Sequence, residues 1–151
     1  MSEHVVARRT RAVFILDIGG EGRYAKAWNL NPSPVRTLGR QRGSAIPRLI
    51  LGRADQIPLP NKSVRLIVCE RTPLRTKAYF EINRVIASDG LIILRHAVPP
   101  GFDPHREAYS HLPRRLHQRN VTLDRCALQE TLFFNGCCER MSQRGGSWWN
   151  G

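Results

Sequence analysis

The residues best suited to chemistry stand where apolar runs give way to polar ones. The run Val13 to Asp17 ends in a carboxylate, and Gly19, Gly20, Glu21 and Gly22 follow as a turn. Glycines let the backbone turn sharply and approach a bound molecule closely. A polar residue and a tight turn after a buried parallel strand are typical of ligand sites in open α/β sheets. The segment therefore indicates a binding site, against the alternative of a plain turn.

Charged side chains also follow two later apolar runs. Glu70 ends the run from Val64, and Arg95 and His96 follow Leu91 to Leu94. Because parallel strands end at the same edge of a sheet, we expect a charged cluster there that also contains Glu21, Arg23 and Asp55. In such a site Glu70 or His96 is the candidate catalytic base, and the arginines would hold an anionic substrate. The alternative is a solvated rim of ion pairs.

Other chemistries have little support in the sequence. The spacing of His105, His111 and His117 is not that of helical metal ligands, so we predict no metal. The four cysteines form no Cys-x-x-Cys pair and are expected to be free thiols (Cys69, Cys126, Cys137 and Cys138). No nucleophile elbow or Walker loop is present, which leaves acyl-transfer hydrolysis and nucleotide binding of that kind unsupported.

The charge balance points to polyanions. The chain has 24 Lys and Arg against 12 Asp and Glu, a formal net charge of +12. Such a field attracts nucleic acid, and arginine suits bidentate contacts to phosphate. Trp148 and Trp149 offer faces on which bases can stack. The alternative is a basic surface with no specific partner.

The length of 151 residues predicts one domain, and we expect residues 1–11 and 143–151 to be loose. Strands are predicted at Val13–Asp17, Val35–Leu38, Val64–Glu70, Leu91–Leu94 and Ala127–Asn135, with a third apolar segment at Ile46–Leu51. Helical patterns are predicted at Tyr24–Trp28 (one or two turns), Pro73–Ala87 and Ala108–Gln118, with a turn at Asp89–Gly90 and a hairpin from Val121–Leu123 to the last strand. This alternation implies a parallel sheet.

Nothing in the sequence suggests a membrane. No apolar run approaches the roughly 20 residues that cross a bilayer. The first residues lack the apolar region of a signal peptide. We therefore expect a cytoplasmic protein, and its oligomeric state stays open.

Three segments together resemble the class I S-adenosylmethionine-dependent methyltransferases. Leu16–Gly22 is similar to the family's glycine-rich loop, Gly52–Cys69 to its adenine segment and the strand that follows, and Glu81–Leu94 to its helix, turn and strand five. The resemblance implies S-adenosylmethionine lying across the strand ends. It places Asp17 and the loop residues Gly19, Gly20, Glu21 and Gly22 near the methionyl part, Asp55 and Gln56 near the adenine, and Glu70 near the transferred methyl group.

The sequence also departs from that family's pattern. Glu21 and Arg23 stand where the family has glycine, and Leu38–Arg40 supplies no carboxylate for the ribose. The fold class we predict is α/β with three layers, a mostly parallel sheet and a truncated, Rossmann-like methyltransferase fold. The leading function is a methyltransferase of unknown substrate, with nucleic acid one candidate. The alternatives are a non-catalytic protein of this fold that binds RNA or a protein, and a small effector or toxin enzyme on the same fold.

Overall fold

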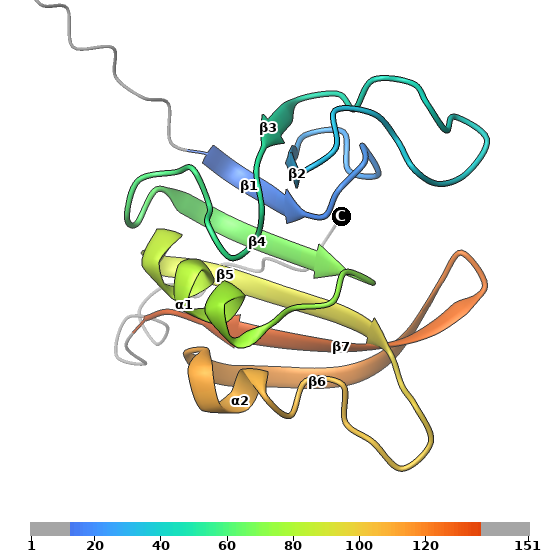
Figure 1. Cartoon of the computed structure of the whole chain (residues 1–151). Coiled ribbons are helices and arrows are strands. Elements are labelled where there is room, and N and C mark those ends of the chain that lie inside the picture. The colour runs from blue at the N-terminus through green and yellow to red at the C-terminus, as the bar shows by residue number, and fades with distance from the viewer. Residues whose placement is uncertain (1–12, 137–151) are drawn as a thin grey trace, which may run out of the picture.

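The computed structural model describes residues 13–136, which form a seven-stranded sheet and two helices (Figure 1). The strand order is β3-β2-β1-β4-β5-β7-β6. Strands β1 to β5 are parallel, while β7 runs antiparallel to both β5 and β6. The chain order reverses between β1 and β4, so the carboxyl ends of these two strands flank the crevice where open α/β sheets bind ligands.

The central strands are those that the apolar runs predict. They are β1 (Val13–Ile18), β4 (Val64–Glu70) and β5 (Ile86–Ala97). Strand β5 begins earlier than predicted, and the turn expected at Asp89–Gly90 lies inside it. The ladder with β4 passes from Val64↔Ile86 to Leu66↔Leu91, so residues 87–90 bulge from the pairing.

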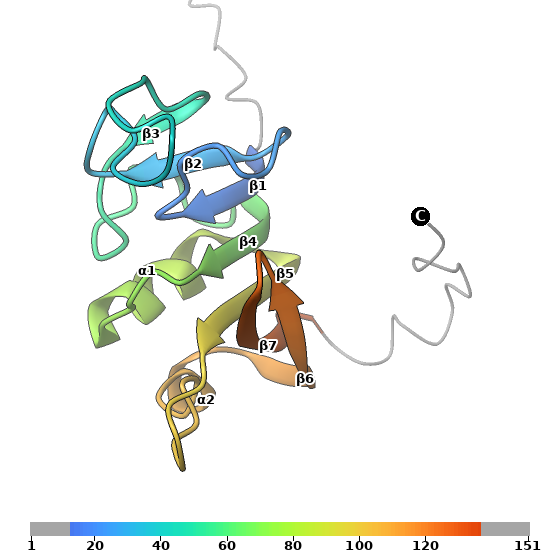
Figure 2. The ribbon, with the colours of Figure 1, turned by 90° about the vertical axis from the view of Figure 1, so that its right-hand side faces the viewer.

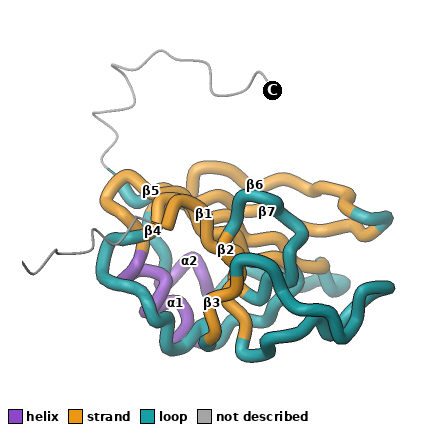
Figure 3. Tube along the Cα trace, turned by 90° about the horizontal axis from the view of Figure 1, so that it is seen from above, coloured by secondary structure: helices purple, strands orange, loops and turns teal. Residues whose placement is uncertain are grey.

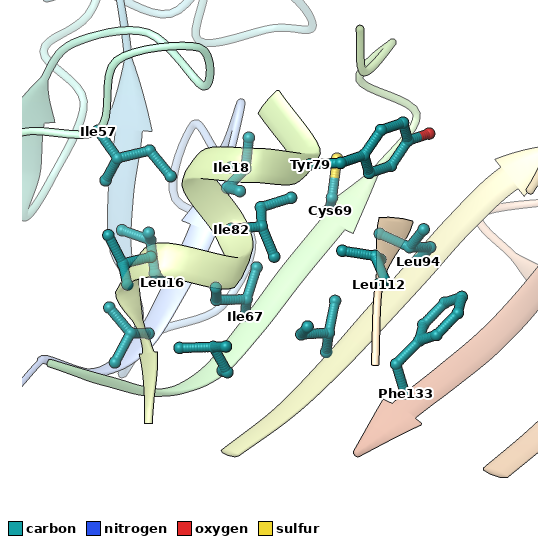
Figure 4. Packing of buried hydrophobic residues seen from close by; sticks show 14 of the residues in the cluster. Leu16, Ile18, Ile57, Ile67, Cys69, Tyr79, Ile82, Leu94, Leu112 and Phe133 are labelled. Atoms are coloured by element: carbon teal, nitrogen blue, oxygen red, sulfur yellow. The ribbon is translucent and has the colours of Figure 1, made fainter. Parts of the chain in front are cut away.

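Helix α1 (Thr76–Val85) lies within the predicted helical segment and packs on the centre of the sheet (Figure 4). Its buried Ile82 contacts a cluster with Leu16 and Ile67 from β1 and β4. Arg84 near the end of α1 donates to the carbonyl oxygens of Ile57 and Leu59, both at 2.8 Å. The helix thereby anchors the irregular segment between β3 and β4 as well as covering the sheet.

The predictions around β2 are wrong. Tyr24–Trp28 is not helical. Residues 24–27 form a bend and a turn, and β2 (Trp28–Asn31) begins at the last residue of the predicted helix. The polar Asn29 and Asn31 fit a buried strand because their amides bind the carbonyl oxygens of Pro47 and Gly20. Val35–Leu38 forms no strand and makes only a single bridge, from Val35 to Ala45. Strand β3 (Leu49–Leu51) is the end of the predicted third apolar segment.

The predicted basic helix Ala108–Gln118 is mostly wrong as well. Helix α2 covers only Ala108–His111, and β6 (Arg114–Leu123) follows. Pro113 cannot continue a helix, since it lacks an N–H and restricts the residue before it. The predicted hairpin is present and longer than expected, because β6 pairs along its length with β7 (Cys126–Phe134).

Both helices lie on one face of the sheet (Figures 2 and 3). The α/β class and the mostly parallel sheet are confirmed, while the described residues supply two of the three predicted layers. No helix among residues 13–136 is long and apolar enough to span a membrane. The predicted loose ends, together with Cys137, Cys138, Trp148 and Trp149, lie outside the described residues.

Candidate functional site

The side chain of Arg23 lies between the ends of β1 and β4. Its Nε donates to Asp17 Oδ2 at 2.9 Å, and its Nη1 donates to Glu70 Oε2 at 2.7 Å. The two carboxylate side chains are only 0% and 4% exposed, whereas Arg23 is 29% exposed. A guanidinium therefore occupies the switch-point crevice and joins the two strands that border it.

The charges continue across the sheet beyond this crevice. Register pairs Glu70 with Arg95, Arg95 with Glu130, and Glu130 with Arg119, on four adjacent strands. Arg95 Nε and Arg119 Nε each donate to Glu130 at 2.7 Å. We call these four residues the charged row. Positive and negative groups alternate along it, so each buried carboxylate has cationic neighbours.

Tyr24 connects the charged row to the glycine-rich turn. Its hydroxyl donates to Glu70 Oε1 at 3.1 Å and accepts from Arg95 Nη1 at 2.5 Å. Each Glu70 oxygen thus accepts from a residue of the loop after β1. Two side chains of this loop, Arg23 and Tyr24, fill the space beside Glu70.

Burial is the largest influence on the ionisation of Asp17 and Arg23. Burial raises the pKa of Asp17, although the hydrogen bond and charge of Arg23 act in the opposite direction. Burial acts to lower the pKa of Arg23, but its two carboxylate partners outweigh that effect and the net shift is upward. Arg23 therefore stays charged and acts as the counter-ion of the crevice.

The glycines of the turn are packed against the protein's own atoms. A Cβ atom on Gly19 would overlap the side chain of Thr72, which follows β4. On Gly20 it would lie 2.5 Å from the Asp17 carboxylate, and on Gly22 it would lie 2.8 Å from Pro47. The absence of side chains at these positions lets neighbouring segments close on the loop and leaves no cradle for a ligand there.

Glu21 points away from the crevice. Its Oε1 accepts from Thr37 N at 2.9 Å and from Thr37 Oγ1 at 2.5 Å, and Oε2 accepts from Leu38 N at 3.4 Å. Partial burial acts to raise the pKa of Glu21, but these donors outweigh it and the net shift is downward. The carboxylate holds the loop that follows β2.

The remaining predicted cofactor residues lie apart from this crevice network. Asp55 pairs with the exposed Arg53 at 3.1 Å, and Gln56 is exposed, its backbone N–H bonded to Arg53 O. At the end of β2 stands Asn31, whose amide bonds Gly20 O and Ser33 N. The strand that normally supplies the ribose-binding carboxylate thus ends in an amide engaged within the protein.

The two candidate bases do not face one another. His96 follows Arg95 on β5 and, because strand side chains alternate, it points to the opposite face from the charged row. There it lines a pocket of about 290 Å³ with residues after β4 and β5, among them Pro73, Leu74, Tyr79 and Phe102. Their catalytic roles stay predictions, and each would need a separate substrate position.

His96 belongs to a chain of hydrogen bonds that sequence reasoning missed. Its Nε2 lies 2.7 Å from Thr72 O, which can only accept, so Nε2 carries the proton. Its Nδ1 then accepts from His105 Nε2 at 3.0 Å, and His105 Nδ1 accepts from Thr131 Oγ1 at 2.7 Å. Burial lowers the pKa of both histidines, that of His105 to about 4. Both rings are therefore neutral at pH 7.

Sequence reasoning also missed Glu130 in the charged row. A signal was present, because Gln129, Glu130 and Thr131 interrupt an otherwise apolar strand. Within residues 13–136, no group of three or more His, Cys, Asp or Glu is placed to hold a metal ion. Cys69 is buried and Cys126 exposed, and neither is in a disulfide.

These observations test whether the implied cofactor fits. S-adenosylmethionine would need the space beside Asp17 and the glycine turn, which Arg23, Tyr24 and Thr72 fill. It would also need a ribose ligand at the end of β2, where Asn31 is already hydrogen-bonded on both sides of its amide. The residues in this arrangement do not fit the cofactor.

Comparison with known proteins identifies the fold. No protein-family model and no curated protein matches the sequence. Solved structures do match. An S-adenosylmethionine-dependent methyltransferase from Aquifex aeolicus is 14% identical with a TM-score of 0.53, over 81% of this chain and 82% of that one.

Two further structures show how widely the fold is used. A Burkholderia thailandensis 1,6-didemethyltoxoflavin-N1-methyltransferase, solved with S-adenosylhomocysteine, has a TM-score of 0.62 at 10% identity and covers 84% of this chain and 72% of its own. The [4+2]-cyclase SpnF has a TM-score of 0.55 at 16% identity, over 74% of this chain and 54% of its own. The fold alone therefore does not decide the reaction. In its strand order and backbone arrangement, the chain has the fold of the class I S-adenosylmethionine-dependent methyltransferases.

Proposed function

We propose that this chain is a non-catalytic protein of methyltransferase fold that binds nucleic acid, with RNA as its partner. The observation that carries the proposal is the Arg23 guanidinium bound to both Asp17 and Glu70 in the switch-point crevice. Because this guanidinium is covalently part of the protein, its effective concentration in the crevice is high. A free ligand would have to displace it to bind in the same space.

The charge distribution supports the choice of partner. Three carboxylates are buried in the crevice and the charged row, each paired with arginine: Asp17, Glu70 and Glu130. Three more are paired with arginine nearer the surface: Asp55, Glu81 and Asp124. Six of the ten acidic residues in the described chain are therefore paired with arginine, and the formal excess of +12 of the whole sequence remains to attract phosphate.

The experiment compares two kinds of ligand. Isothermal calorimetry with S-adenosylmethionine and with S-adenosylhomocysteine should give no binding heat up to millimolar concentration. Fluorescence anisotropy with a labelled oligouridylate should show binding whose affinity falls steeply as salt rises. Saturable binding of either cofactor form would overturn the non-catalytic part of the proposal, and absence of RNA binding at low salt would overturn the choice of partner.

Methyl transfer is the second candidate, and one observation favours it. The crevice is occupied by the Arg23 guanidinium, which is a cation, and the methionyl end of S-adenosylmethionine also carries positive charge. The buried carboxylates of Asp17 and Glu70 could therefore pair with Arg23 or with the cofactor. Arg23 is 29% exposed and has a path to solvent. Under this alternative the cofactor displaces Arg23, and Arg23→Gly should then bind S-adenosylhomocysteine more tightly than the unchanged protein does. Calorimetry on the two proteins distinguishes the candidates.

A further inference from the structure

We infer that residues 35–45, the arginine loop, form a preorganised phosphate-binding element for single-stranded RNA that Glu21 holds in place. The inference rests on the proposed function and names its binding surface. The arginine loop connects β2 with β3 and projects beside these strands in Figure 1.

The arginine loop is exposed yet held by many hydrogen bonds. Val35 bridges Ala45, Arg36 N donates to Ser44 O, and Gly43 N donates to Arg36 O, the last two at 2.8 Å. Gly39 and Gly43 have positive φ angles of 73° and 84°, which glycine adopts without strain and which reverse the chain at the tip. This geometry places the tip residues Arg40, Gln41 and Arg42 between two glycine turns.

The anchor of the arginine loop comes from the glycine-rich turn. Glu21 accepts two hydrogen bonds from Thr37 and one from Leu38, as described above, and its own carbonyl oxygen accepts from Arg36 Nε at 2.8 Å. Glu21 stands where the resembled family has glycine. The Glu21 carboxylate therefore has a structural role in this chain, because it positions the arginine loop.

The tip arginines are available to a partner. Within residues 13–136, the side chains of Arg40 and Arg42 make no hydrogen bond or ion pair. The chain from Gly22 to Ala54 contains no acidic residue, so the field around the tip is positive. An ordered loop with two unpaired guanidinium groups binds phosphate at a smaller entropic cost than a flexible one.

A phosphodiester backbone fits this surface better than a membrane does. The arginine loop exposes two large apolar side chains, Leu38 (76%) and Val35 (39%), and contains no amphipathic helix of the kind that lies in a membrane interface. Duplex RNA is recognised through contacts that span successive minor grooves, which a loop of residues 35–45 alone is too small to reach. The partner expected is therefore a single strand bound through its backbone.

The first test removes two positive charges from the arginine loop and, in a control variant, two positive charges from elsewhere on the surface. Arg40→Gln/Arg42→Gln and the control Arg65→Gln/Arg106→Gln each remove two exposed arginines that lack carboxylate partners in the described chain. Anisotropy with labelled oligouridylate across a salt series gives the number of phosphates contacted. We expect the loop variant to reduce the logarithmic salt slope by about 1.4, two contacts at about 0.7 each, and the control to leave it unchanged.

The second test removes the negative charge of Glu21 and asks whether RNA affinity rises or falls. Glu21→Ala makes the protein more basic, so simple attraction predicts tighter RNA binding. If Glu21 positions the arginine loop, binding should instead weaken, by about fivefold for the loss of ordering hydrogen bonds. Asp89→Asn removes an exposed acid elsewhere and should leave binding equal or slightly tighter. Circular dichroism and urea unfolding check that each variant is folded.

The outcomes separate the inference from the proposed function. Equal weakening by both arginine pairs, or tighter binding by Glu21→Ala, overturns the inference while RNA binding itself stands. Failure of the unchanged protein to bind oligouridylate overturns both. Binding to phosphatidylserine vesicles that the loop variant abolishes, with weaker binding to RNA, assigns the loop to a membrane and overturns the inference.

Discussion

At the scale of single residues, Arg23 has the largest consequences. It connects the loop after β1 to both strands of the switch point. Two buried carboxylates without a cation would be costly, because the protein interior solvates charge poorly. The arginine therefore serves the stability of the crevice as well as closing it.

We expect Arg23→Ala to lower the free energy of unfolding by about 3–5 kcal/mol, since it leaves buried charge without a partner. Urea denaturation at pH 7 measures the loss. Arg53→Ala is the matched control, because Arg53 pairs with Asp55 at the exposed surface and should leave the midpoint nearly unchanged. Equal losses in the two variants would contradict the assignment of Arg23 as the crevice counter-ion.

The buried histidines predict how stability changes with pH. The pKa of His105 is about 4 in the folded protein against 6.5 for the free side chain. Between these values the unfolded chain binds more protons, so the free energy of unfolding falls as the pH drops from about 6.5 toward 4. The full shift corresponds to about 3 kcal/mol.

Urea titrations across this pH window measure the effect. His105→Gln should flatten the profile, because glutamine can donate to His96 without titrating. His117→Gln is the control, since His117 is exposed on β6, and it should keep the slope. A profile that stays steep in His105→Gln would assign the titration to another group.

At the scale of elements, the important contact joins the loops after β1 and β4. Thr72 packs against Gly19 across the switch point, and its carbonyl oxygen also accepts from His96 on β5. The segment after β4 is thereby held from both sides. The Thr72 side chain thus closes on the Gly19 backbone independently of the Arg23 side chain.

Gly19→Ala tests that contact, and Gly39→Ala supplies an unusually close control. Both glycines have a φ of 73°, but a Cβ atom on Gly39 would meet nothing within 4 Å. Gly39→Ala should cost about 1–2 kcal/mol for the left-handed backbone alone. Gly19→Ala should cost about 1–3 kcal/mol more, for overlap with Thr72.

Thermal or urea unfolding measures both variants. A Gly19→Ala/Thr72→Gly double variant should recover most of the difference, compared with Thr72→Gly alone in a double-mutant cycle. Equal losses for Gly19→Ala and Gly39→Ala would mean that the two loops do not pack as described.

At the scale of the whole molecule, two asymmetries stand out. The described helices cover one face of the sheet, while apolar side chains on the other face stay half-buried, among them Ile15, Leu66, Leu91 and Ile93. The charges are also divided: the buried acids Asp17, Glu70 and Glu130 are paired with arginine, whereas Arg40 and Arg42 are exposed without such a partner in the described chain. Within residues 13–136, the uncovered face differs from the arrangement in a fully layered α/β protein, in which helices cover both faces of the sheet.

Local patterns in the sequence are enough to predict the central part of the sheet. The apolar runs predict β1 and β4 almost to the residue, and the 3.6-residue pattern predicts α1 to within three residues at each end, because local periodicity reports burial on one face or two. The alternation of these elements predicts the parallel sheet, and three short segments point to the methyltransferase fold. Those signals are local, so they can be read from the chain.

Strands β2 and β6 and the closed crevice depend on contacts between residues far apart in the sequence, which local patterns do not report. Strand β6 is exposed along most of its length, so it shows no apolar period and resembles a basic helix. Trp28–Asn31 becomes a strand because its asparagines find carbonyl partners far along the chain. Arg23 and Glu70 are 47 residues apart, and a long flexible side chain has no preferred destination until the fold brings its partners together.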